Sequence, residues 1–144
     1  MNLLNRQMAS ELAPLVLRLV LGLIFLIHGS AKFIHMSNAV AGFTRLGVPL
    51  PGFSAIVIGL LEVIGGIALI LGLGLWTRIL AFLLAIEMLV AIPLAKRHAG
   101  FVGGYEFELL LFAGLLAIVL GGQGLPALVR ELRPAFPIQH EQAD

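Results

Sequence analysis

The chain has 144 residues, of which 60% are hydrophobic and 12% are charged, about half the charged share of an ordinary soluble domain. With a mean hydropathy of +1.06, a chain this short cannot bury its apolar surface in water, which excludes most soluble enzymes. Its 9 basic and 8 acidic residues form no basic run, which excludes a nucleic-acid binder. The absence of cysteine excludes disulfides, thiolate catalysis and Cys-ligated metal clusters. We therefore expect an integral protein of the lipid bilayer.

Four apolar segments are long enough to cross a membrane, since a transmembrane helix needs about 20 mostly apolar residues. The segments cover approximately residues 13–33, 53–75, 77–95 and 105–125. Their apolar runs are continuous and do not alternate, which favours helices over barrel strands. The sequence predicts an all-α protein with a four-helix transmembrane bundle as a single domain over residues 1–128. A polar C-terminal tail follows over residues 129–144.

A short additional helix is predicted between the first and second spans. Val40, Phe43 and Leu46 recur at three-residue spacing, which is typical of a short interfacial helix. Gly47 and Pro49 follow them and would stop any helix that crosses this connection.

Ionisable residues within the spans are the main functional signal in the sequence. A charged side chain at the centre of a span costs about 2.5 to 3.5 kcal/mol on insertion scales, so such residues normally face the bundle interior and have partners. One face of the first helix carries Arg18, Gly22, Gly29 and Lys32, with His28 at its edge. The glycines on this face let another helix approach closely, so we expect the face to pack inward.

The other spans bring carboxyl groups to similar depths. Glu62 and Glu87 lie near the middle of the second and third spans, and Glu108 lies about one turn into the fourth. Because neighbouring helices run in opposite directions, these carboxyl groups and His28 fall in the same half of the bilayer. We predict that His28, Lys32, Glu62, Glu87 and Glu108 line one polar pocket, with Lys32 at its mouth.

Three further charges are expected outside this pocket. Arg18 and Arg78 are interpreted as helix-end anchors that extend toward water, and Glu106 as a charge at a helix end or behind the pocket. No metal site is predicted, because the Glu-x-x-His pairs of di-metal bundles are absent and His28 is the single histidine within a span.

Several interpretations of the pocket are open from the residues alone. Burial favours the neutral form of a carboxyl group and a nearby cation favours its charged form, so such groups can exchange protons near neutral pH. This chemistry suits a quinone, which gains or loses protons together with electrons. The alternative is that the polar residues only hold the helices together. A small transporter is disfavoured, because four spans offer little room for alternating access and no helix is obviously broken.

The chain resembles the DoxX family of small bacterial four-span membrane proteins over roughly residues 18–128. The resemblance rests on the order and spacing of small and charged residues, namely Gly22, Phe25, Gly29, Lys32, Gly47, Pro49, Pro51, Glu62, Gly65, Gly66, Gly74, Thr77, Arg78, Gly103, Gly104, Glu106, Gly122 and Gly124. The chain departs from the family after the final glycines, where Ala127, Leu128 and Val129 replace a frequent Ser-Leu-Asp ending.

The resemblance implies a multi-pass protein of the bacterial inner membrane, and we expect both termini on the cytoplasmic side. It also implies a subunit of a quinone-linked oxidoreductase assembly, similar to thiosulfate:quinone oxidoreductase, or a component of an oxidant or quinone stress system. The expected ligand is a non-covalently bound quinone, and the expected partners are oxidoreductase subunits or a second copy of the chain. The resemblance supplies no catalytic residues. The alternative is a non-catalytic membrane scaffold that recruits partners.

Overall fold

The computed structural model describes residues 3–96 and 100–121, and it contains helices but no β-strand in these ranges. The helices are α1 (Leu3–Ile34), α2 (Met36–Arg45), α3 (Pro51–Leu71), α4 (Leu75–Ala91) and α5 (Glu106–Gly121). A short π-helical segment, η1 (Ile92–Lys96), follows α4, and the kinked segment η2 (Phe101–Tyr105), whose backbone is non-helical at its centre, precedes α5. Four of the described helical segments are long and apolar enough to cross a membrane. The predicted all-α bundle of four spans is therefore confirmed.

The ends of the predicted spans differ from those observed. The second span was predicted to reach residue 75, but α3 ends at Leu71 because Gly72 takes the left-handed conformation with φ 70°. The third span loses its regular α-helical form at Ile92, in the segment that contains Pro93. The predicted end of the fourth span and the polar tail over residues 129–144 lie outside the described residues.

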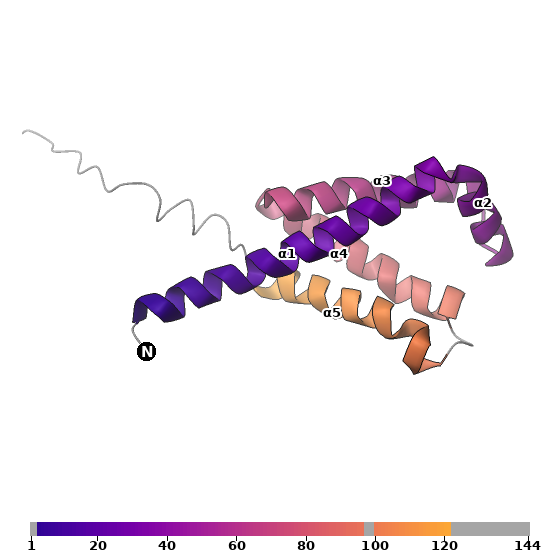
Figure 1. Cartoon of the computed structure of the whole chain (residues 1–144). Helices are drawn as coiled ribbons and strands as arrows, with labels where there is room; N and C mark the ends of the chain where they lie inside the picture. The colour runs from indigo at the N-terminus through magenta and orange to yellow at the C-terminus, as the bar shows by residue number, and fades with distance from the viewer. Residues whose placement is uncertain (1–2, 97–99, 122–144) are drawn as a thin grey trace, which may run out of the picture.

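The predicted short helix is present as α2, which lies at the end of the bundle where α1 ends and α3 begins (Figure 1). It contains Val40 and Phe43, whereas Leu46 directly follows it. Gly47 comes next with φ 70°, and this backbone conformation stops the helix at the predicted place. Its location at the bilayer interface stays a prediction.

The four long helices form two pairs, since α1 packs mainly on α3 and α4 packs mainly on α5. Figure 1 shows that the pairs meet near the connection between α3 and α4 and separate toward the end where α2 lies. The buried core sits where the pairs meet. It consists of Leu21, Phe25, Leu69, Ala81, Leu84, Ala85, Met88, Leu111, Leu115 and Ile118.

Glycines let the backbones of α1 and α3 come into contact. A Cβ atom added at Gly66 would lie 2.7 Å from the carbonyl oxygen of Gly22, and one added at Gly29 would lie 2.8 Å from the carbonyl oxygen of Gly59. Neither position has room for a side chain. The sequence prediction that the glycine-bearing face of the first span packs inward is therefore correct.

Arg18 is buried, which contradicts its interpretation as an anchor that extends toward water. The side chain is 1% exposed, and its Nε donates to the carbonyl oxygen of Leu69 over 2.9 Å. Its Nη2 donates to the carbonyl oxygen of Ile70 over 3.4 Å. The last carbonyls of a helix lack partners within the helix, and they carry the negative end of its dipole. Arg18 thus caps the C-terminus of α3 from inside the bundle.

Two other side chains bond to helix-end carbonyls on the same side of the molecule. Thr77 is buried, and its Oγ1 donates to the carbonyl oxygen of Ala68 over 2.9 Å. Arg78 is exposed, and its Nε and Nη2 donate to the carbonyl oxygen of Val119 in α5 over 3.1 and 2.8 Å. Arg78 therefore lies at a helix end, as predicted, but it also ties α4 to α5.

We expect Gly66→Ala to destabilise the bundle by about 1 to 3 kcal/mol, because the added methyl group forces α1 and α3 apart. Gly52→Ala is the matched control on the same helix, since a Cβ atom there meets nothing within 4 Å. Thermal unfolding of both variants in detergent measures the difference. Equal unfolding midpoints for the two variants would show that the close helix contact is unimportant for stability.

We expect Arg18→Met to destabilise the protein by about 1.5 to 3 kcal/mol, because it leaves buried carbonyl groups of α3 without partners. Arg78→Met serves as the control, since it removes a hydrogen-bonded arginine from an exposed position. The same unfolding assay applies. A smaller loss for Arg18→Met than for Arg78→Met would contradict the capping role.

Candidate ligand-binding cavity

A cavity of about 840 Å³ lies between the two helix pairs. This volume is in the range of sites that enclose small organic ligands. The side chains of all five residues predicted to form a polar pocket line it, namely His28, Lys32, Glu62, Glu87 and Glu108. The structure thus brings together residues from α1, α3, α4 and α5. Whether they bind a ligand stays a prediction.

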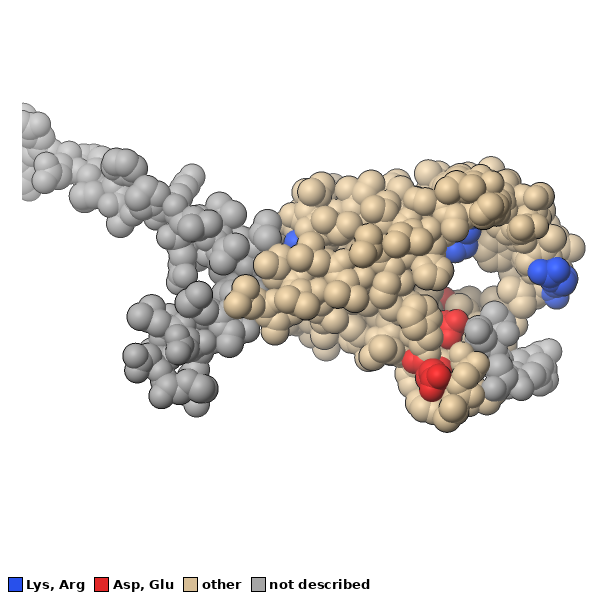
Figure 2. Space-filling view, in the orientation of Figure 1, with Lys and Arg blue, Asp and Glu red and all other residues tan. Residues whose placement is uncertain are grey.

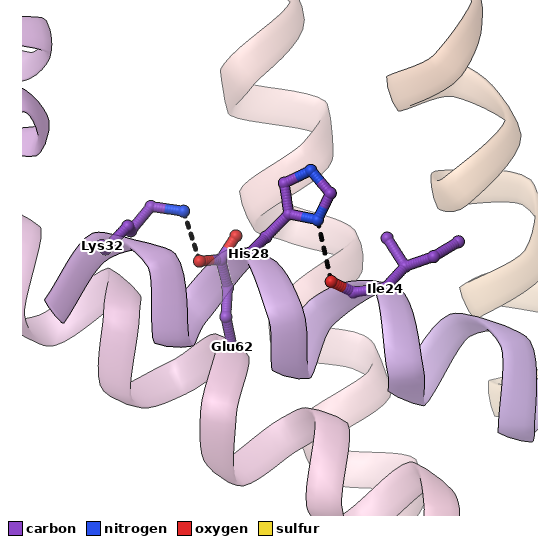
Figure 3. A network of polar contacts seen from close by, with 4 residues as sticks. All are labelled: Ile24, His28, Lys32 and Glu62. Atoms are coloured by element: carbon purple, nitrogen blue, oxygen red, sulfur yellow. Dashed lines mark hydrogen bonds and ion pairs between the residues drawn. The ribbon is translucent and has the colours of Figure 1, made fainter. Parts of the chain in front are cut away.

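Lys32 and Glu62 form an ion pair between α1 and α3. The Lys32 ammonium donates to Oε2 of Glu62, and Figure 3 shows the two side chains pointing toward each other. The Glu62 side chain is 5% exposed and that of Lys32 is 23% exposed. The close backbone contact at Gly29, one turn before Lys32, sets the short helix separation that this pair requires.

Glu87 reaches the same cluster from α4. Its carboxyl group is close enough to Glu62 for a hydrogen bond between the two side chains, and it also interacts electrostatically with Lys32. Its Oε2 is buried and has no hydrogen-bond partner among the described residues. The cluster therefore holds two carboxyl groups and one ammonium group, so a single proton on the carboxyl pair makes it electrically neutral.

His28 lies on α1, one turn before Lys32, and it is exposed to the cavity. Its Nδ1 is 2.8 Å from the carbonyl oxygen of Ile24 (Figure 3). A carbonyl oxygen only accepts hydrogen bonds, so we assign the proton of the neutral ring to Nδ1. The lone pair on Nε2 is then free to accept a hydrogen bond. The ring also lies near Phe107 of α5, with centroids 6.3 Å apart.

The remaining predicted charges lie away from the cavity lining. Glu106 is exposed at the start of α5, where its Oε1 accepts a hydrogen bond from the backbone N–H of Gly103 over 2.9 Å. Arg18 and Arg78 lie toward the opposite end of the bundle. By contrast, Glu108 lines the cavity although it is only two residues beyond Glu106.

Most of the cavity wall is apolar, and this part was missed by the sequence analysis. Phe43 in α2, together with Leu46 and Val48 in the following connection, contributes a wall that the predicted spans do not supply. The regular spacing of Val40, Phe43 and Leu46 was a signal for an amphipathic helix, but it did not indicate what that helix would contact. The other apolar lining residues are Ile24, Phe25, Phe53, Val57, Ile58, Leu61, Leu83, Ile86, Met88, Val90, Ala91, Leu94, Phe107 and Leu111.

The charges visible at one end of the molecule in Figure 2 are unevenly distributed. Figure 2 shows a notch at the end of the molecule near α2, with Lys and Arg side chains on one lobe and Asp and Glu side chains on the other. Within residues 3–96 and 100–121, no group of three or more His, Asp or Glu side chains is arranged to hold a metal ion.

Comparisons with known proteins agree with this architecture. The family model named DoxX matches residues 13–97 of the chain. A relative from Bacillus subtilis, named "Putative oxidoreductase CatD", is 38% identical over 118 residues, which cover 82% of this chain and 85% of the relative.

Two further relatives have names that state no activity. An uncharacterised membrane protein of Mycobacterium tuberculosis is 35% identical over 130 residues, which cover 81% of this chain and 78% of that protein. An uncharacterised protein of Haemophilus influenzae is 35% identical over 119 residues, which cover 78% and 84% of the respective chains. No solved structure matches the chain.

We expect the ion pair to show strong thermodynamic coupling. Lys32→Met leaves Glu62 buried without its cation, so it should destabilise the protein more than the same change made together with Glu62→Gln. A double-mutant cycle measured by thermal unfolding should give a coupling free energy of about 0.5 to 3 kcal/mol. Additive effects of the two changes would show that the pair contributes nothing beyond its separate members.

Proposed function

Because the chain belongs to the DoxX family of membrane proteins, we propose that it is a membrane subunit of a redox system and binds a lipophilic quinone in the cavity between its helix pairs. The observation that carries this proposal is the cavity itself. The cavity combines an apolar wall with a cluster of ionisable groups. A quinone has an apolar ring and two polar oxygens, so it fits a site with both kinds of lining.

The polar cluster suits the proton chemistry of a quinone. Reduction of a quinone to a quinol takes two electrons and two protons, which form two new O–H bonds. The carboxyl groups of Glu62, Glu87 and Glu108 exchange protons with the ligand, and the Lys32 ammonium stabilises negative charge on a ligand oxygen. The electrons come from or go to a partner oxidoreductase, because carboxyl and ammonium groups exchange protons but not electrons and the sequence has no cysteine.

We also propose a redox role for the chain in the bacterial inner membrane. An oxidoreductase name for the Bacillus subtilis relative supports a redox role, although that name states no substrate. The bacterial inner membrane is the expected location, with both termini on the cytoplasmic side. The expected partners are membrane or peripheral oxidoreductase subunits, and a second copy of the chain is a further one.

We expect Ala91→Phe to weaken quinone binding at least about tenfold, because the added ring occupies part of the cavity that Ala91 lines. Ala117→Phe is the matched control, since it makes the same change at an exposed position of α5. Binding of a benzoquinone with a short alkyl tail to the purified full chain can be measured by native mass spectrometry in detergent or nanodiscs.

Two results would contradict the proposal. Unchanged affinity in Ala91→Phe would show that the quinone binds elsewhere. Absence of saturable binding to a correctly folded wild-type chain would favour the alternative of a non-catalytic scaffold whose polar residues hold the bundle together.

A further inference from the structure

We propose that the cavity prefers the reduced quinol, whose ring carries O–H groups, over the oxidised quinone, whose ring carries only C=O groups. This inference rests on the proposed function and specifies the redox form of its ligand. It follows from the hydrogen-bonding groups that the cavity leaves available, since a quinol donates hydrogen bonds and a quinone only accepts them.

The first available acceptor is Oε2 of Glu87. This oxygen is buried, and no described group donates a hydrogen bond to it. The Glu87 carboxyl group interacts with Glu62 on one side. Because Oε2 has no hydrogen-bond partner among the described residues, the bond between Glu87 and Glu62 uses Oε1. A proton shared in that bond leaves Oε2 as a carbonyl oxygen, and ionised Glu87 has a carboxylate oxygen there. In both cases Oε2 accepts a hydrogen bond, and leaving it without a donor is unfavourable.

The second available acceptor is Nε2 of His28. The contact between Nδ1 and the carbonyl oxygen of Ile24 assigns the ring proton to Nδ1, so Nε2 presents a lone pair. Because the ring lines the cavity, a ligand hydroxyl group can reach it. Nε2 of His28 on α1 and Oε2 of Glu87 on α4 are thus two hydrogen-bond acceptors without a donor in the described part of the chain.

The side-chain donors of the lining each already have an acceptor within the protein. Lys32 donates to Glu62 and interacts electrostatically with Glu87, so its ammonium group is attracted by two carboxyl groups. The hydroxyl group of Ser54 donates to the carbonyl oxygen of Pro49 over 2.8 Å. A quinone oxygen therefore bonds to an ammonium group that already faces two carboxyl groups, or competes with a carbonyl oxygen for the Ser54 hydroxyl group, whereas a quinol hydroxyl group meets acceptors to which no described group donates.

The free-energy cost of leaving these acceptors without a donor determines how strongly the cavity prefers the quinol over the quinone. Sites whose buried polar groups require a ligand hydroxyl group discriminate strongly against analogues without it. One unsatisfied buried acceptor changes an affinity by about 5-fold to 150-fold, with tenfold corresponding to about 1.4 kcal/mol. We therefore expect the quinol to bind at least about tenfold more tightly than the quinone.

The test compares both redox forms of one benzoquinone that carries a short alkyl tail. Each form is titrated anaerobically against the purified full chain in nanodiscs, and binding is followed by native mass spectrometry or calorimetry. Glu87→Gln should reduce the preference for the quinol, because the amide group can turn its N–H donors toward a quinone oxygen. Glu106→Gln should keep the wild-type preference, since Glu106 does not line the cavity and a glutamine oxygen can still accept the bond from Gly103.

The outcomes separate this inference from the proposed function. If the wild-type chain binds the quinone as tightly as the quinol, the inference is wrong and the binding function stands. If neither form binds to a folded chain, both are wrong. If the quinol is preferred but Glu87→Gln keeps the full preference, the acceptor role of Glu87 is wrong. The wild-type comparison needs no variant, so it remains decisive even if Glu87→Gln fails to fold.

Discussion

The close contact between α1 and α3 is the constraint on which the rest of the structure depends. Glycines at two points of contact have no room for a side chain, so the two backbones touch there. This short separation lets Lys32 reach Glu62 at one end and lets Arg18 reach the last carbonyl groups of α3 at the other. Larger residues at the glycine positions would separate each charge from its partner.

The two ends of the bundle differ in how their buried polar groups are hydrogen-bonded. At the end near the connection between α3 and α4, Arg18 bonds to the last carbonyl groups of α3, which lack partners within the helix. Thr77 adds a second bond to the carbonyl oxygen of Ala68, which also accepts from the backbone N–H of Gly72. At the other end the helix pairs separate, and the polar groups face a cavity with an apolar wall. One end is therefore closed by internal hydrogen bonds, whereas the other retains a buried oxygen of Glu87 that has no donor among the described residues.

This contrast weighs against a purely structural role for the whole polar set. The Lys32 and Glu62 side chains satisfy each other and fit the description of residues that hold helices together. Glu87 differs, because one of its carboxyl oxygens is buried without a hydrogen-bond partner among the described residues. Retaining such a group costs stability, so its presence beside a large cavity is more readily explained by ligand binding than by packing.

Composition and apolar length by themselves determined that this is an all-α membrane protein, and helical spacing determined that the glycine face of the first span packs inward. These properties are local, because span length and the faces of a helix follow from nearby residues. Only the tertiary structure decided which group each charge contacts. Arg18 meets carbonyl groups instead of water, and α2 supplies part of the cavity wall. Such contacts depend on the rotation and separation of helices far apart in the chain, which hydropathy and spacing do not encode.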